Sequence, residues 1–169
     1  MPKYQWKHLN GLQVGAYAEY FVKMEFTMAG FQVFMPEVDD RGIDFIVRFG
    51  TGCWHEIQVK SVRTSSYIFL AKDKFALSPT LYAAIVILPE GRQPDLYLIP
   101  SLAWKQPGKF LVERTYEGLQ SAPEWGINLS KRNMPLLEEY RFDTVVGKIC
   151  QSSPPTASSA VDRKLWQAK

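Results

Sequence analysis

Two runs rich in β-branched and aromatic residues, 42–49 and 54–62, flank the glycine-containing turn 50–52. Such runs favour strands and such turns favour hairpins, so the sequence predicts an antiparallel β-hairpin. A hairpin symmetric about its turn puts Asp44 opposite Gln58, on the same face of the sheet. A slip of one residue would send the two side chains to opposite faces, so this register constrains the fold more than any other feature.

Because side chains alternate along a strand, the register sorts the hairpin into two faces. The apolar face is formed by Phe45, Val47, Ile57 and Val59. The polar face carries Asp44, Glu56, Gln58 and Lys60. Two acids, an amide and a lysine suit a site that cleaves phosphodiester bonds with Mg²⁺, and they also suit a plain solvated strand face. Both interpretations stay open on this pattern alone.

A helix is predicted before the hairpin. Asn10 and Gln13 are spaced as a capping box, and Gly30 fits the stop after the helix. Apolar residues recur every three or four positions between these signals, and Glu19 lies beside their stripe. Gly15 lies one turn before Glu19 on the same side of the helix. Because glycine has no side chain, the carboxylate has room to reach past the helix toward the sheet. The alternative is an exposed glutamate on the flank of the helix. Residues 31–35 then predict a strand.

Further elements are predicted downstream of the hairpin. The continuous apolar run 81–88 indicates a buried strand, and 95–99 is its antiparallel partner. We expect further strands at 67–71, 110–116 and 126–129, and short helices at 72–78, from Ser101 as N-cap, and at 133–142.

A helix glutamate, a strand, Gly42-Ile43-Asp44, a hairpin and Gln58-Val59-Lys60 follow one another in this chain. In this order they resemble the PD-(D/E)XK nuclease superfamily, in the branch related to archaeal Holliday-junction resolvases and restriction-like endonucleases. The resemblance covers about residues 11–63. Ile43 stands where the family name has proline, and Gln58 replaces the second acid.

The resemblance implies an α/β fold, with a mixed central β-sheet flanked by helices as in the restriction-endonuclease-like α/β/α sandwich. It also implies a site. Asp44 would be the central Mg²⁺ ligand, and Glu19 would bind the metal directly or through water. The side-chain oxygen of Gln58 and the backbone carbonyl of Val59 would complete the protein ligands. Lys60 would orient or deprotonate the attacking water, and Mn²⁺ is expected to substitute for Mg²⁺.

The chemistry of Mg²⁺ agrees with these roles, because the ion prefers hard oxygen ligands and keeps several waters. Losing an acid at Gln58 removes one negative charge, which Glu56 is positioned to restore. The formal net charge of +3 permits nucleic-acid binding without requiring it. We expect Arg63, Lys72 and Lys74 to face a phosphate backbone, and the alternative is a scattered solubilising surface.

We expect one nuclease domain over residues 1–150 and a flexible tail rich in Ser, Pro and Ala over 151–169. The 46% hydrophobic content is enough for a core of that size. Two cysteines and two histidines without a ligand spacing argue against a disulfide framework or a zinc site. Without a membrane-spanning run or a signal peptide, the chain is expected to be cytoplasmic and not membrane-bound.

The sequence therefore predicts a metal-dependent endonuclease that hydrolyses phosphodiester bonds, with DNA favoured through the resemblance, of the restriction-like, homing or junction-resolving kind. One alternative is a non-catalytic nucleic-acid-binding or assembly module on the same fold. Another is a small α/β protein of unrelated function whose polar hairpin face is plain surface. Because one compact site cuts one strand, cutting of both strands implies a homo-oligomer, a dimer or a tetramer.

Overall fold

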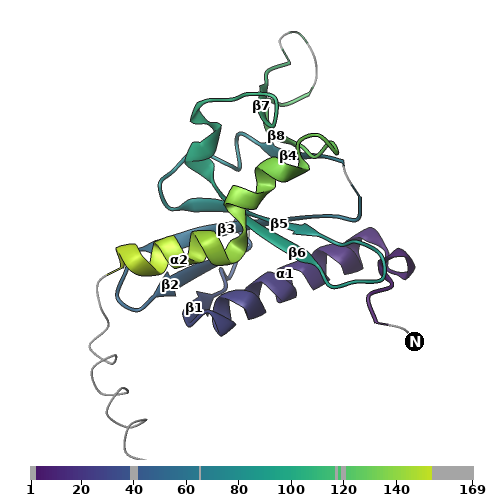
Figure 1. Ribbon diagram of the computed structural model, residues 1–169. Coiled ribbons are helices and arrows are strands. Elements are labelled where there is room, and N and C mark those ends of the chain that lie inside the picture. Colours follow the sequence, from purple (N-terminus) through teal and green to yellow (C-terminus); the bar gives the residue numbers. More distant parts are fainter. Residues whose placement is uncertain (1–2, 39–41, 65, 117, 119–120, 154–169) are drawn as a thin grey trace, which may run out of the picture.

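The computed structural model describes residues 3–38, 42–64, 66–116, 118 and 121–153 of the chain (Figure 1). Its elements are η1 (Trp6–His8), α1 (Gly11–Met28), β1 (Phe31–Phe34), β2 (Phe45–Phe49), β3 (Trp54–Val62), β4 (Tyr67–Ala71), β5 (Leu81–Ile87), β6 (Asp95–Pro100), η2 (Ser101–Lys105), β7 (Leu111–Arg114), β8 (Glu124–Asn128), η3 (Met134–Tyr140) and α2 (Phe142–Ser152). Within the described residues, no helix combines the length and apolarity needed to cross a bilayer.

Helix α1 begins and ends as its sequence predicts. The side chain of Asn10 accepts the N–H of Gln13 at 2.9 Å, and the side chain of Gln13 accepts the N–H of Asn10 at 2.9 Å. This capping box satisfies amide groups that a helix start leaves unpaired, which stabilises it by about 1 kcal/mol. Gly30 follows the helix with a φ of +85°, a conformation that only glycine adopts without strain.

The main sheet has the order β1-β2-β3-β5-β6. Its hairpin register is the predicted one over residues 45–48, whereas the expected pair of Asp44 with Gln58 is not part of the ladder. Phe45 lies opposite Ile57, and Arg48 lies opposite Trp54. Strand β3 runs parallel to β5, whereas the other neighbours in the sheet are antiparallel. The expected mixed central sheet is therefore confirmed, whereas the expected layer of helices is present on one of its faces and a second sheet covers the other.

Two hydrophobic clusters cover the two faces of this sheet. Tyr82, Ala84 and Val86 of β5 belong to the cluster that contains the buried residues of α1 and α2. The alternating residues Ala83 and Ile85 belong to the cluster shared with β4, β7, β8 and Trp104. Figure 1 shows β4, β7 and β8 gathered at one end of the molecule, away from α1 and β1. Both α-helices thus pack on one face, and a second, three-stranded sheet of order β4-β8-β7 covers the other.

The segment 72–78 is not a helix, contrary to the expectation. It turns back at once, because the N–H of Lys74 bonds the carbonyl of Ala71, and then runs extended. Phe75 is fully buried in the second cluster, and Ser78 bonds through its N–H to the hydroxyl of Ser101. Ser101 therefore does not cap η2 as expected, because its hydroxyl holds this extended segment instead.

The C-terminal helix α2 was not predicted. The expected helix over 133–142 is the 3₁₀ segment η3, and α2 begins immediately after it and runs to Ser152, into the segment expected as a tail. Phe142, Val145, Val146 and Ile149 form its buried face at helical spacing, a signal present in the sequence. The rest of the expected tail, 154–169, lies outside the described residues.

His55 lies in the core, on the helix-covered side of β3, as the register predicts. Its side chain is buried and its ring meets that of Tyr82 at 5.4 Å and 80°. Its Nδ1 has no hydrogen-bond partner among the described residues. Burial lowers the pKa of His55 below its ordinary value, because the charged imidazolium is costly to remove from water.

This burial predicts a loss of stability in mild acid. With its pKa lowered in the folded state, His55 binds fewer protons there than in the unfolded chain near pH 6. The free energy of unfolding should therefore fall as the pH drops below about 6.5 and level off below the folded-state pKa. Urea unfolding from pH 8 to pH 5 would measure this decrease. The free energy of unfolding of His55→Phe should fall less steeply with pH than that of wild type. Parallel curves for the two proteins would assign the acid sensitivity to other groups.

Candidate active site

Asp44 immediately precedes β2, at the point where β3 continues past its hairpin partner. Paired positions of the hairpin stop at Phe45 and Ile57, and β3 then extends to Val62 beside β5 alone. The N–H of Asp44 bonds the carbonyl of Ile57 at 3.0 Å. Its Oδ2 accepts the N–H of Val59 at 2.5 Å. The carboxylate thus replaces a strand partner at the edge of β3, in the middle of the Gln58-Val59-Lys60 segment.

Val59 turns its backbone polar groups toward Asp44. In a strand, the N–H and C=O of one residue point to the same side, and the Val59 N–H points to the Asp44 carboxylate. The Val59 carbonyl is therefore directed to the same open edge. Its side chain packs against the helix-covered cluster. Gln58 and Lys60 consequently face the opposite side of the sheet, as the register predicts.

The Gln58 amide is buried, and its oxygen lacks a partner among the residues that the structure describes. The side chain is 7% exposed, and Oε1 makes no hydrogen bond to any described residue. Leaving a buried acceptor unpaired costs about 1–3 kcal/mol, so such an atom calls for a ligand. A Cβ placed on Gly42 would lie 2.7 Å from Nε2 of Gln58, so the absence of a side chain at Gly42 makes room for this amide.

Glu19 belongs to the α1 side of the sheet. Its carboxylate is 3.8 Å from the ammonium of Lys23, and its side chain is 38% exposed. The Lys23 ammonium also lies 5.9 Å from the ring of Phe45, the neighbour of Asp44. Glu19 is therefore linked through Lys23 to the end of the hairpin that carries Asp44, and its role as a metal ligand stays a prediction.

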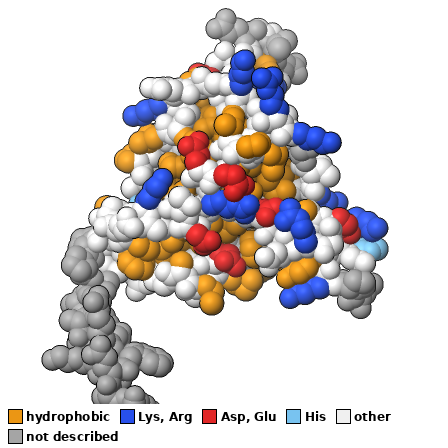
Figure 2. All heavy atoms as spheres, viewed as in Figure 1, with side chains coloured by type: hydrophobic (Ala, Val, Ile, Leu, Met, Phe, Trp, Pro, Cys, Tyr) orange, Lys and Arg blue, Asp and Glu red, His pale blue; other side chains and the backbone are white. Residues whose placement is uncertain are grey.

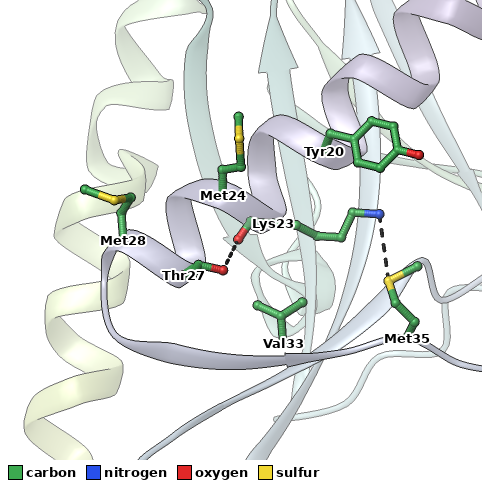
Figure 3. A pocket seen from close by; sticks show the side chains of 7 residues that line it. All are labelled: Tyr20, Lys23, Met24, Thr27, Met28, Val33 and Met35. Atoms are coloured by element: carbon green, nitrogen blue, oxygen red, sulfur yellow. Dashed lines mark hydrogen bonds between the residues drawn. The ribbon is translucent and has the colours of Figure 1, made fainter.

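Lys23 borders an apolar groove on the outer side of α1 (Figure 3). The groove has a volume of about 610 Å³ and is lined by Tyr20, Lys23, Met24, Thr27, Met28, Val33 and Met35. Figure 3 shows the Lys23 side chain running along it, with its ammonium directed to the sulfur of Met35 at 3.8 Å. Lys23 is thus held by Glu19 and Met35 together, which fixes one cation near the start of β2.

The three basic residues expected to meet substrate lie in different places. Lys74 lies beside the site, since its Cβ would be 3.2 Å from a Cβ on Gly42. Arg63 donates to the carbonyl of Leu9, at the far end of β3. Lys72 pairs with Glu113 and lies 4.1 Å from the ring of Trp125, in the second sheet. Of the three, Lys74 is brought next to Gln58.

The residues present fit a hard cation with few protein ligands. The described residues contain no group of three or more His, Cys, Asp or Glu side chains able to hold a metal. They do place the Asp44 carboxylate on the N–H of Val59, the residue that follows Gln58, and Oε1 of Gln58 has no hydrogen-bond partner among the described residues. Oxygen donors of these kinds suit Mg²⁺, which keeps much of its hydration shell when bound. The fit favours Mg²⁺ or Mn²⁺ over a metal that needs nitrogen or sulfur ligands.

Gly42 is a site residue that the sequence signalled only as part of a motif. Its φ of +73° requires glycine, and its missing side chain admits Gln58. We expect Gly42→Ala to lower the free energy of unfolding by about 1–3 kcal/mol and to displace the Gln58 amide. Gly91→Ala is the matched control, because Gly91 has a φ of +79° with open space around its Cβ position.

Thermal unfolding of the two variants separates backbone strain from the loss of room for Gln58. Both should be destabilised by strain, and only Gly42→Ala should also lose stabilisation by added Mg²⁺ or Mn²⁺. Equal responses of both variants to the metals would remove Gly42 from the site.

The face covered by α1 and α2 carries mixed charges. Figure 2 shows basic and acidic side chains side by side in the middle of this face. The ion pairs of the described residues include Arg92 with Asp95 at 2.8 Å and Arg141 with Glu138 at 3.0 Å. Opposite charges this close cancel much of each other's field, so these pairs add little attraction for a polyanion. The Gln58 row lies on the other face of the sheet.

Comparison with known proteins supports the fold. The sequence matches no protein-family model and no curated protein. The structure is similar to that of the bacterial homing endonuclease I-Ssp6803I, with a TM-score of 0.51 and 16% sequence identity, over 92% of this chain and 98% of that one. It also matches Hjc, a Holliday junction resolvase from Archaeoglobus fulgidus, with a TM-score of 0.44 and 20% identity, over 69% of this chain and 91% of that one. The similarity to I-Ssp6803I confirms the expected restriction-endonuclease-like fold.

Proposed function

We propose that this protein is a metal-dependent endonuclease that hydrolyses phosphodiester bonds in DNA. The observation that carries the proposal is the buried Oε1 of Gln58, which has no hydrogen-bond partner among the described residues and precedes the Val59 N–H that the Asp44 carboxylate accepts. The fold shared with a homing endonuclease supports it. DNA is favoured over RNA because the similar structure is that of a homing endonuclease, and the choice among restriction-like, homing and junction-resolving enzymes is left to experiment.

In this proposal each residue of the candidate site has one task. Asp44, Gln58 and the Val59 carbonyl would hold Mg²⁺ or Mn²⁺, with Glu19 reaching it through water. The bound ion would acidify a water molecule and stabilise the charge that develops on the phosphate. Lys60, on the same face as Gln58, orients the attacking water and offsets charge on the phosphate. Lys74 neutralises a neighbouring phosphate and so positions the strand.

Cleavage of a mixed panel of substrates tests the proposal. Plasmid, linear duplex, a four-way junction, single-stranded DNA and RNA would be incubated with Mg²⁺, with Mn²⁺ and with EDTA. We expect cleavage of at least one DNA substrate with either metal and none in EDTA. Cleavage of RNA alone would replace DNA by RNA as the substrate, and cleavage that persists in EDTA would contradict the metal-dependent mechanism.

A non-catalytic nucleic-acid-binding module is the second candidate. It is favoured by the uncharged Gln58 and by the lack of a three-acid cluster among the described residues. Such a module would bind the panel without cutting it under any metal condition, and its binding would be indifferent to loss of the Asp44 charge. Assembly as a dimer or tetramer and a cytoplasmic location stay predictions.

A further inference from the structure

The face of β1, β2 and β3 that carries Gln58 continues into a pocket beside the candidate site. Register partners share a face, and Phe34, Ile46 and Glu56 lie in one row across the three strands. Gln58 follows Glu56 by two residues on the same strand, roughly 7 Å away. The pocket has a volume of about 430 Å³ and is lined by Phe34, Ile46, Trp54, Glu56 and Thr80.

Two exposed aromatic rings in contact with each other line this pocket. Phe34 is 43% exposed and Trp54 is 45% exposed, although both are large apolar side chains. Their ring centroids are 4.8 Å apart at an angle of 70°. The Arg48 guanidinium lies 4.3 Å from the centroid of the Trp54 ring and is held by bonds to Gln32. Rings and a cation kept exposed on a sheet face are the features with which proteins stack single nucleobases.

The floor of the pocket adds a charged acceptor. Glu56 lines it, and its carboxylate makes no hydrogen bond or ion pair to any described residue. An ionised carboxylate only accepts hydrogen bonds. It therefore matches a base with an exocyclic amino group, such as the N4 amino group of cytosine, and opposes the O4 carbonyl of thymine or uracil.

We propose that this pocket binds one unpaired base of the nucleic acid strand, next to the nucleotide at the candidate cleavage site, and selects a base that carries an exocyclic amino group. The base packs against the continuous surface that the two touching rings of Phe34 and Trp54 form, Glu56 accepts from its amino group, and Arg48 faces the neighbouring phosphate. The placement of the pocket relative to the cut rests on the proposed endonuclease function, whereas base binding itself does not.

Binding of short oligonucleotides in EDTA tests the proposal without cleavage. Fluorescence anisotropy would compare labelled ten-nucleotide strands of deoxycytidine and of thymidine, which differ at the pocket by an amino group against a carbonyl. Wild type should bind the cytosine strand about five- to tenfold more tightly. Glu56→Gln, whose amide both donates and accepts, should bring the two affinities within about twofold. Trp54→Ala should weaken binding of both strands by about tenfold.

Phe69→Ala is the matched control, because Phe69 is 58% exposed on β4 of the second sheet. It should bind both strands as wild type does. Trp54→Phe keeps an aromatic wall and should retain most of the affinity, which covers the case in which the alanine variant fails to fold. Equal affinities of wild type for the two strands, no binding of either strand, or unchanged binding by Glu56→Gln would overturn the proposal.

The two proposals fail separately. Selective binding lost in Glu56→Gln, together with no cutting of any substrate, would keep the base pocket and reject the endonuclease. Metal-dependent cutting by a protein that does not distinguish cytosine from thymine would keep the endonuclease and reject the base pocket.

Discussion

Replacing Asp44 by asparagine should reduce metal-dependent cleavage by about 10³-fold or more, because it removes the carboxylate that the described residues place at this edge of β3. The amide oxygen of asparagine can still accept the N–H of Val59, so the contact seen at 2.5 Å has a neutral replacement. The free energy of unfolding should therefore change by only about 1 kcal/mol. Initial cleavage rates on the best substrate of the panel, with Mg²⁺ and with Mn²⁺, would measure the effect.

Two further variants give this result its meaning. Asp73→Asn removes an exposed carboxylate in the turn after β4 and should cut at the wild-type rate. Lys60→Ala should lose cleavage while keeping the stabilisation that Mg²⁺ gives to the folded protein, whereas Asp44→Asn should lose both. An Asp44→Asn protein that cuts as fast as wild type would remove Asp44 from the site and with it the proposed mechanism.

Truncating Phe26 to alanine should lower the free energy of unfolding by about 3–5 kcal/mol. Phe26 is fully buried in α1 and meets Phe31, Phe45 and Phe142 at centroid distances of 5.2, 6.0 and 4.9 Å. These rings come from β1, from β2 directly after Asp44, and from α2. The cavity left by the ring would loosen the packing of Phe45, the residue after Asp44. The position of Asp44 against β3 would then be less well fixed, so the cleavage rate should fall as well.

Urea unfolding would compare Phe26→Ala with Met24→Ala on the same helix. Met24 is 56% exposed, and its truncation should change the free energy of unfolding by at most about 0.5 kcal/mol. If Phe26→Ala lowers the free energy of unfolding by less than about 1 kcal/mol, the packing of Phe26 against the three other rings does not contribute much to stability. Recovery of most of the stability in Phe26→Leu would identify lost volume, and not lost ring geometry, as the cause.

The sequence determined the local elements that build the candidate site. The capping box and Gly30 set the bounds of α1, because backbone groups at helix ends must be satisfied nearby in the chain. The turn at 50–52 and the alternation of its flanking strands set the hairpin register, and with it the faces of Gln58, Val59 and Lys60. These features depend on residues a few positions apart, so their signals are complete within short segments.

Long-range packing decided what lies beside those elements. The segment 72–78 does not form the expected helix because Phe75 is buried against Trp104 and Ser78 bonds Ser101. Both contacts join residues far apart in the chain, so no local pattern predicts them. Helix α2 carried a readable apolar stripe, and only the cluster around Phe26 shows where that stripe docks.

The candidate site divides in the same way. Its residue types and their order were readable in the sequence, whereas the bond from Val59 to Asp44, the unpartnered Oε1 of Gln58 and the approach of Lys74 to Gly42 were not. The Phe34–Trp54 pocket also needed three strands side by side. A sequence fixes which groups are available and which way a strand turns them. Distances between groups far apart in the chain are fixed only when the core brings their elements together.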